Sequence, residues 1–301
     1  MSIKCPVCDS INLKKIYKGR DRVIEPFLPV GLAELILLRC KSCGMIFLDA
    51  SGFDMKAIHE AYWKMLIDNT AENCSPQTSV RPESLLNELE SRRMTGNLVE
   101  IGCGDGKFLK AARERGWKVS GIEISERAAD IARLACGGNI LSGAFELEGL
   151  KFEPGTFDVA VMWGVIEHLK HPREALMAAK ELLRKGGMLV IYTPNADSIF
   201  HRAGRAFYFS TFGLVRFFME RLIIAMHIMY FSPRVLQVLL SGRGFRIVRV
   251  VNVGIDIDFI FKAHKNLWWS NKHFLIAAKA VQKIGHIFSI DSHTIVFAES
   301  A

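Results

Sequence analysis

A glycine-rich loop between a strand and a helix is the feature that most constrains the fold of this chain. Residues 98–101 form a mostly apolar run that predicts a buried strand, residues 102–106 follow as G-x-G-x-G, and an amphipathic helix is expected from Lys107. Glycines let the backbone pass close beneath a ligand, whose groups then meet the helix N-terminus. The next strand, residues 119–122, ends at Glu123, an acid placed to accept both hydroxyls of a ribose. Loop and acid together predict a ligand that contains adenosine.

The spacing of these glycines distinguishes between adenosine ligands. The dinucleotide fingerprint is G-x-G-x-x-G, whereas Lys107 stands where its last glycine would be. Glu100 also precedes the loop, where a carboxylate repels a pyrophosphate but supports a cationic amino group. Both observations disfavour NAD.

The stretch 97–195 resembles the class I S-adenosylmethionine-dependent methyltransferases. Residues 100–106 are similar to their first motif and Glu123 to their ribose-binding acid, while residues 157–161 and 183–191 are similar to their fourth strand and to the passage into their fifth. The resemblance implies an α/β fold with a Rossmann-like, seven-stranded, doubly wound sheet, and S-adenosyl-L-methionine as cofactor. It implies a cofactor site made of Glu100, Gly102, Cys103, Gly104, Gly106, Glu123, Ile124, Ala144, Phe145 and Trp163.

The adenine end of that site departs from the family pattern. The family often has an acid just after the third strand, whereas residues 142–146 read Ser-Gly-Ala-Phe-Glu. Backbone groups of Ala144 and Phe145, with the Phe145 ring as a stacking face, are expected to substitute. Trp163 is expected to form a wall over the adenosylmethionine rather than to act in catalysis.

Two histidines are the candidate catalytic residues. Residues 164–169 and His227 look like those of bacterial methyltransferases that include ubiquinone-biosynthesis O-methyltransferases. His168 follows the fourth strand, at the carboxyl edge where doubly wound folds bind ligands, and can act as general base; the alternative is that it steadies the next helix start. His227, on a predicted helical run 222–228, either faces the pocket or bonds a backbone carbonyl.

The N-terminus carries a candidate metal site. Two C-x-x-C pairs, Cys5/Cys8 and Cys40/Cys43, can place four thiolates around one structural Zn²⁺. The alternative is two independent reduced pairs. A head of this kind joined to the methyltransferase core resembles a further bacterial set that includes sugar C-methyltransferases.

These patterns divide the chain into three parts. We expect a zinc-ribbon-like head at residues 1–50, a helical linker at 51–95 and the methyltransferase domain at 96–301, with helical insertions at about 199–240 and 255–290. The longest uncharged apolar run is too short to span a bilayer, and the first residues lack the apolar segment of a secretion signal. A cytoplasmic location is therefore expected.

Charge gives the remaining prediction about partners. The chain carries 39 Lys and Arg against 31 Asp and Glu, and residues 196–301 hold 13 of the basic but only six of the acidic ones. Aromatic and basic residues mix in both insertions, which predicts a lid packed on the core or, alternatively, a contact with the inner face of a membrane. A small anionic acceptor is expected.

The functional hypothesis follows from these patterns. It is methylation of a hydroxyl or carbon nucleophile on a small sugar-nucleotide- or lipid-linked substrate. Alternatives are a quinone-type O-methyltransferase, an RNA methyltransferase, and an adenosylmethionine-binding module without catalysis; RNA is disfavoured because no Asn-Pro-Pro-Tyr-like signature follows the fourth strand.

Overall fold

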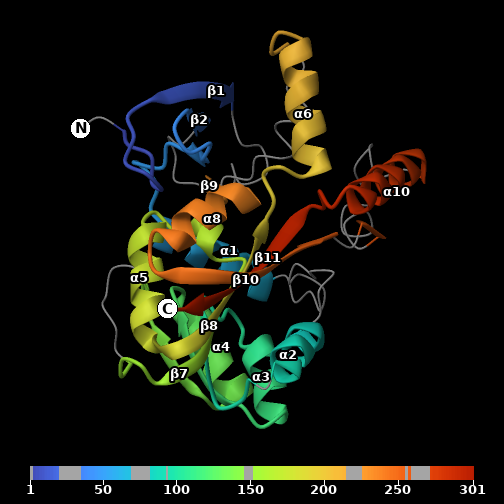
Figure 1. Ribbon diagram of the computed structural model, residues 1–301. Helices are drawn as coiled ribbons and strands as arrows, with labels where there is room; N and C mark the ends of the chain where they lie inside the picture. Colours follow the sequence, from blue (N-terminus) through green and yellow to red (C-terminus); the bar gives the residue numbers. More distant parts are fainter. Residues whose placement is uncertain are drawn as a thin grey trace.

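A seven-stranded sheet forms the centre of the molecule (Figure 1). The computed structural model describes residues 3–19, 35–68, 82–92, 94–145, 152–214, 226–254, 257–258 and 272–301. Within those residues, every helix is too short or too polar to cross a membrane.

The order of the strands fixes where a ligand can bind. From one edge to the other it is β10-β11-β8-β7-β4-β5-β6, with β11 antiparallel to both its neighbours and the five strands from β8 to β6 parallel. The chain reverses direction across the sheet between β4 and β7, so a crevice opens at their carboxyl ends. The predicted fold class is confirmed. The strands are β4 (Asn97–Ile101), β5 (Lys118–Glu123), β6 (Asn139–Ser142), β7 (Phe157–Trp163), β8 (Leu183–Pro194), β10 (Phe245–Val253) and β11 (His293–Ser300).

Helices cover both faces of this sheet. Along β7, Val159 and Val161 belong to one apolar core and Ala160 and Met162 to the other, because successive strand residues point to opposite faces. Both faces must therefore be buried, as parallel sheets require. On the first face pack α2 (Pro82–Ser91), α3 (Lys107–Glu114) and α4 (Glu126–Cys136); on the second pack α5 (Pro172–Leu182) and α8 (Pro233–Ser241).

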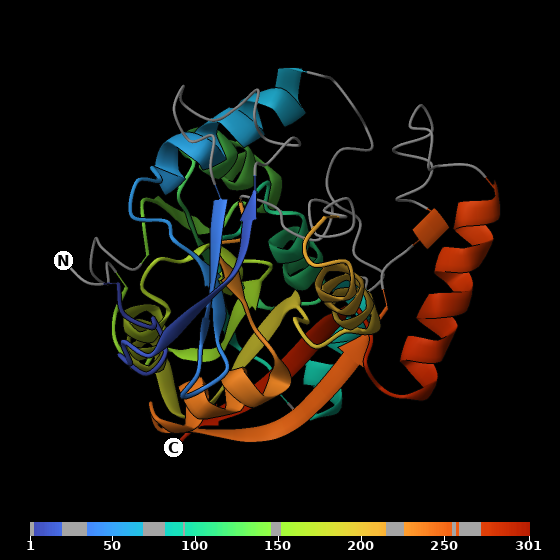
Figure 2. The same ribbon diagram turned by 90° about the horizontal axis from the view of Figure 1, so that it is seen from above.

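A second sheet joins the N-terminal head to the rest of the chain. Strands β1 (Leu13–Gly19), β2 (Leu35–Cys40) and β3 (Ile46–Leu48) form an antiparallel sheet, and β9 (Met229–Tyr230) extends it by pairing with β3. The view from above in Figure 2 shows these strands crossing over the central sheet. Helix α1 (Met55–Asp68) follows the head directly.

The helix predicted over residues 222–228 is wrong at its C-terminal end. Residues 226–228 form a turn and an extended segment that leads into β9, while 222–225 lie outside the described residues. Ile228 accepts a backbone hydrogen bond from Leu48 at 2.8 Å, so pairing with the head overrides the local helical pattern.

Two helices project from the body of the protein. Helix α6 (Ile199–Ser210) stands at the top of Figure 1, and α10 (Lys272–Ile287) lies at the right-hand edge of Figure 2. Phe212 and Leu214, just beyond α6, are 94% and 85% exposed. The parts of the two predicted insertions at 215–225, 255–256 and 259–271 lie outside the described residues.

Candidate functional site

The glycine loop after β4 is bent so that its backbone faces the crevice. Gly102, Gly104 and Gly106 have φ of +72°, +54° and +76°, a region that residues with a side chain rarely adopt. A Cβ on Gly106 would lie 2.9 Å from the Cα of Ala132, so only glycine allows this approach of loop and α4.

Glu123, at the end of β5, holds the loop from the opposite side. Its two carboxylate oxygens accept hydrogen bonds from the backbone N–H groups of Gly104, at 2.9 Å, and Ser125, at 3.0 Å. Burial raises the pKa of this carboxyl, and those N–H groups counteract the rise. The adjacent Ile124 is half-buried at the same turn. Each oxygen retains lone pairs for a further donor, such as a ribose hydroxyl.

Glu100 is a second buried acid beneath the loop. It is 4% exposed, and its Oε2 has no hydrogen-bond partner among the described residues. Burial, together with the negative charges of Asp105 and Glu123, raises its pKa well above the ordinary value. A buried carboxylate without a counter-ion is unfavourable, so this site fits a cationic ligand group such as the amino group of adenosylmethionine.

The other predicted cofactor residues differ in what they offer the crevice. Cys103 is buried, and its sulfur lies against Gly121 in the core. Only the backbone of Cys103 can therefore face the crevice. Phe145 is also a core residue, while Ala144 beside it is half-buried. Trp163 is half-buried and stacks on Tyr192, with ring centroids 4.6 Å apart.

Helix α1 packs on the two cofactor loops, namely the glycine loop after β4 and the turn after β5. The sequence did not predict this contact. The Glu60 carboxylate accepts hydrogen bonds from the Ser125 hydroxyl and the Glu126 backbone N–H, both at 2.9 Å. A Cβ on Gly104 would lie 3.0 Å from the Trp63 ring. A polar amphipathic helix carries no motif for this position, so only the folded contact identifies it.

Replacing Glu60 by alanine is expected to weaken adenosylmethionine binding by up to about 30-fold. The change removes two hydrogen bonds that hold the Ser125 turn against Glu123, each worth about 1 kcal/mol net. Calorimetric titration measures the effect. Lys64→Ala, an exposed position on the same helix, is the matched control, and equal affinity of both variants would exclude this role for Glu60.

Three imidazoles meet at the carboxyl edge of the sheet. The His168 ring lies 4.9 Å from that of His227 and 5.1 Å from that of His59, which α1 contributes. Nδ1 of His168 is 2.6 Å from the Met226 carbonyl oxygen. Since a carbonyl only accepts, Nδ1 carries the proton, and Nε2 remains a proton acceptor.

The same cluster includes a buried acid. Glu167 accepts a hydrogen bond from the Thr193 hydroxyl at 2.9 Å. One potential metal-ligating atom from each of Glu167, His168 and His227 lies within 4.8 Å of the other two, a spacing at which a divalent cation can bind. The structure thus brings the two predicted catalytic histidines together and adds His59 and Glu167.

Burial sets the protonation states in this cluster. It lowers the pKa of His168 to about 3 and that of His59 to about 4, and it lowers the pKa of His227 well below 6.5; neighbouring imidazoles add to each effect. Burial raises the pKa of Glu167 to about 7. All three imidazoles are therefore neutral near pH 7, and the unprotonated Nε2 of His168 carries a free lone pair.

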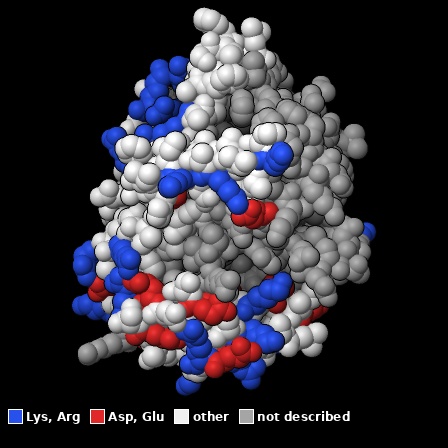
Figure 3. Space-filling model, turned by 90° about the vertical axis from the view of Figure 1, so that its right-hand side faces the viewer, with Lys and Arg blue, Asp and Glu red and all other residues white. Residues whose placement is uncertain are grey.

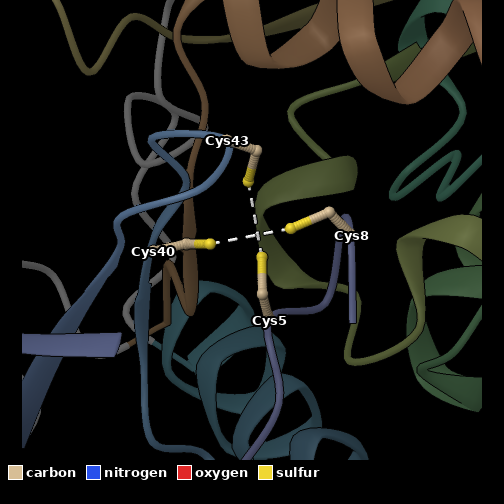
Figure 4. A group of neighbouring side chains, drawn as sticks. All are labelled: Cys5, Cys8, Cys40 and Cys43. Carbon is tan, nitrogen blue, oxygen red and sulfur yellow. Dashed lines mark hydrogen bonds between the residues drawn. The ribbon is translucent and has the colours of Figure 1, made fainter. Parts of the chain in front are cut away.

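The four head cysteines converge on one point (Figure 4). Their sulfurs lie within 4.8 Å of one another, with Cys5 to Cys43 at 3.5 Å and Cys8 to Cys40 at 3.6 Å. Zn–S bonds of about 2.3 Å in a tetrahedron require sulfurs about 3.8 Å apart. The arrangement fits one Zn²⁺.

Three of these thiols differ in pKa. Burial alone would raise the pKa of Cys40, but the N–H groups of Cys43 and Ser42 bring it down to about 6. Burial raises the pKa of Cys5 and Cys43 above that of an exposed thiol. A metal ion in their midst would favour the thiolate form of all four.

Comparison with known proteins gives one family. A family model described as a methyltransferase domain matches residues 65–250, more than half of the chain. The chain is 29% identical over 104 residues to a ubiquinone biosynthesis O-methyltransferase of Azoarcus sp. (strain BH72) and 31% identical over 105 residues to that of Thiobacillus denitrificans. These matches cover 33% and 34% of this chain and 45% of each relative, so the chain spans a little less than half of the relatives' length.

Solved structures agree on the fold. A geranyl diphosphate C-methyltransferase of Streptomyces coelicolor superposes with a TM-score of 0.52 and 14% identity, over 83% of this chain and 99% of that one. The cyclase SpnF superposes with a TM-score of 0.54 and 15% identity, over 82% and 97%. At such identities the likeness concerns the fold alone, and one of these two proteins is named as a cyclase.

Proposed function

The chain belongs to the methyltransferase domain family, and from this premise we propose that it transfers a methyl group from S-adenosylmethionine to a hydroxyl or carbon nucleophile of a small anionic substrate. One observation carries the proposal: an acidic cradle, Glu100 and Glu123, lies at the same sheet edge as the neutral imidazoles of His168 and His227. A cradle of this charge suits a cationic donor, and the imidazoles suit an acceptor that must lose a proton.

The residues divide the work between donor and acceptor. Bound S-adenosylmethionine supplies a methyl group already activated on a sulfonium. Glu123 accepts hydrogen bonds from the ribose, and Glu100 balances the positive charge. Nε2 of His168 accepts the proton that the nucleophile loses. The hydrogen bond from Nδ1 to the Met226 carbonyl keeps the ring in the tautomer with Nε2 unprotonated. His227, whose ring lies 4.9 Å from that of His168, orients the acceptor.

Substituting either histidine is expected to slow methyl transfer while leaving cofactor binding intact. His168→Gln and His227→Gln should each lower the rate about 100-fold, the lower range for loss of a general base. Adenosylmethionine affinity, measured in parallel, should change less than about two-fold. The control is His273→Gln on the exposed side of α10. A variant with unchanged rate but lower melting temperature would assign that histidine to the structure alone.

The acceptor class has two candidates. We favour a sugar-nucleotide- or lipid-linked acceptor because of the basic charge of the C-terminal third. A quinone-type acceptor is the second candidate, supported by the similarity to ubiquinone biosynthesis O-methyltransferases. RNA methylation and a binding module without catalysis are the remaining alternatives.

The accessory parts have proposed roles of their own. The head at 1–50 is proposed to hold one structural Zn²⁺, and the linker at 51–95 to carry α1 over the cofactor. The exposed tip after α6, with Phe212 and Leu214, is proposed to contact the inner membrane face peripherally.

Cofactor titration tests the proposal. S-adenosylmethionine and S-adenosylhomocysteine are expected to bind in calorimetry, and NAD is not, because the buried acids oppose a pyrophosphate. Tighter binding of NAD than of either methyl-transfer ligand would contradict the proposed function.

A further inference from the structure

We infer that Arg39, Arg202 and Arg205 form a binding subsite for a phosphate or diphosphate group of the acceptor, between the head sheet and helix α6. This inference rests on the proposed function and extends it, since it states where the anionic part of the substrate is held. It gives the head a role in substrate binding in addition to metal binding.

Helix α6 crosses one face of the head sheet. Tyr208 contacts Tyr17 of β1, with ring centroids 5.5 Å apart, and His201 contacts Tyr230 of β9 at 6.2 Å. Arg205 lies between these two contacts along the helix, four residues after His201. It therefore lies on the side of α6 that faces the sheet.

Arg39 lies on that same face of the sheet. In the antiparallel register Arg39 pairs with Lys14 on one side and Ile46 on the other, and Ile46 pairs with Tyr230. Residues directly opposite each other point to the same face, so Lys14 and Arg39 share the face of Tyr230. The sheet thus presents two exposed cations toward the base of α6.

The arginines of α6 are anchored beside the histidine cluster. Arg205 donates to the Ala196 carbonyl at 2.7 Å and Arg202 to the Asp197 carbonyl at 2.8 Å. These carbonyls belong to the turn that follows β8, and Ala196 also donates its N–H to the Phe231 carbonyl, close to β9. A group bound here lies at the turn after β8, at the same edge of the sheet as the histidine cluster.

Among the described residues, positive charge in this region exceeds negative charge. The Arg205 side chain is 19% exposed, and among the described residues its one carboxylate partner is Asp197, at 3.6 Å. Burial lowers its pKa, Asp197 opposes that effect, and Arg39 and Arg202 add to it. In the described part of the chain Arg39 and Lys14 have no acidic partner. A partly buried guanidinium beside other cations is stabilised by an anion.

Figure 3 shows that charge is unevenly distributed over this side of the molecule. In Figure 3, Lys and Arg side chains gather at the upper left without Asp or Glu among them, whereas basic and acidic side chains alternate in the lower half. Guanidinium groups bind phosphate oxygens in pairs, which suits a phosphate or diphosphate better than a lone carboxylate.

Titration with inorganic pyrophosphate tests the subsite. The full-length protein is titrated calorimetrically, with zinc content checked before and after. Arg39→Gln and Arg202→Gln are expected to weaken pyrophosphate binding about 10-fold each, since each removes a charge-assisted contact. Both positions are exposed, so the fold should tolerate the changes. Arg246→Gln, exposed and distant on β10, is the matched control and should bind like the unaltered protein.

Two further arms identify the source of the phosphate. Tighter binding of uridine diphosphate than of pyrophosphate supports a nucleotide-linked acceptor, and tighter binding of farnesyl diphosphate supports a lipid-linked one. Absent pyrophosphate binding, or equal binding by all variants, would overturn the subsite. The subsite would also be overturned if the variants lost affinity for phosphatidylglycerol vesicles but kept their affinity for pyrophosphate. Adenosylmethionine affinity is measured in the same samples, so a failure of the proposed function would be recognised separately.

Discussion

Replacing Glu123 by alanine should weaken S-adenosylmethionine binding at least about 100-fold. The carboxylate is the proposed acceptor for the ribose hydroxyls, and two charge-assisted hydrogen bonds of about 1.5 kcal/mol each amount to roughly this factor. The change also leaves the N–H groups of Gly104 and Ser125 without their acceptor, so both cofactor loops lose a common anchor. Calorimetric titration with adenosylmethionine and adenosylhomocysteine measures the effect.

A matched control separates this role from a general effect of charge. Glu126 is exposed three residues further along, and Glu126→Ala removes one negative charge from the same helix start. Its adenosylmethionine affinity should stay within about two-fold of the unaltered protein. If Glu123→Ala binds as well as Glu126→Ala, Glu123 is not the ribose acceptor.

Replacing Cys5 by serine should abolish zinc binding and lower the melting temperature by about 10 °C. A tetrahedral site that loses one thiolate binds Zn²⁺ far more weakly, and the energy of metal binding is folding energy in such sites. A loss of about 3 to 5 kcal/mol corresponds to such a shift for a domain of this size. Elemental analysis and thermal unfolding measure the two effects.

The position of the head predicts an effect beyond the head. Because β3 pairs with β9, loss of zinc should disturb His227, which lies two residues before β9, and so slow methyl transfer. Cys136→Ala is the control, since Cys136 is buried in α4 outside the cluster and should leave the zinc content unchanged. Full zinc occupancy in Cys5→Ser would refute the four-cysteine site.

Local motifs allowed the sheet and the cofactor loop to be predicted. The glycines at 102–106 and the acid at Glu123 follow buried strands closely in sequence, so strand, turn and ligand-facing group are encoded within a few residues. The convergence of the four cysteines could also be predicted, because the two-residue spacer of each C-x-x-C pair places both of its sulfurs toward one point.

Contacts between distant segments could not be predicted in this way. Glu60 and His59 reach the site because α1 packs on the cofactor loops, a contact with residues more than 60 positions away. The apolar neighbours of His227 have helical spacing, which predicts a helix. Pairing of β9 with β3 instead imposes an extended chain on the residues that follow His227. Tertiary contacts of this kind leave no local pattern in a single sequence.

Transfer of a labelled methyl group tests the central claim most directly. The protein is incubated with adenosylmethionine labelled on its methyl carbon and with lipid, sugar-nucleotide and RNA fractions of bacterial cells, beside the Glu123→Ala variant. Label is expected in the sugar-nucleotide or lipid fraction, together with formation of adenosylhomocysteine, and neither is expected with the variant. Label in RNA, or cofactor binding with no transfer to any fraction, would contradict the central claim.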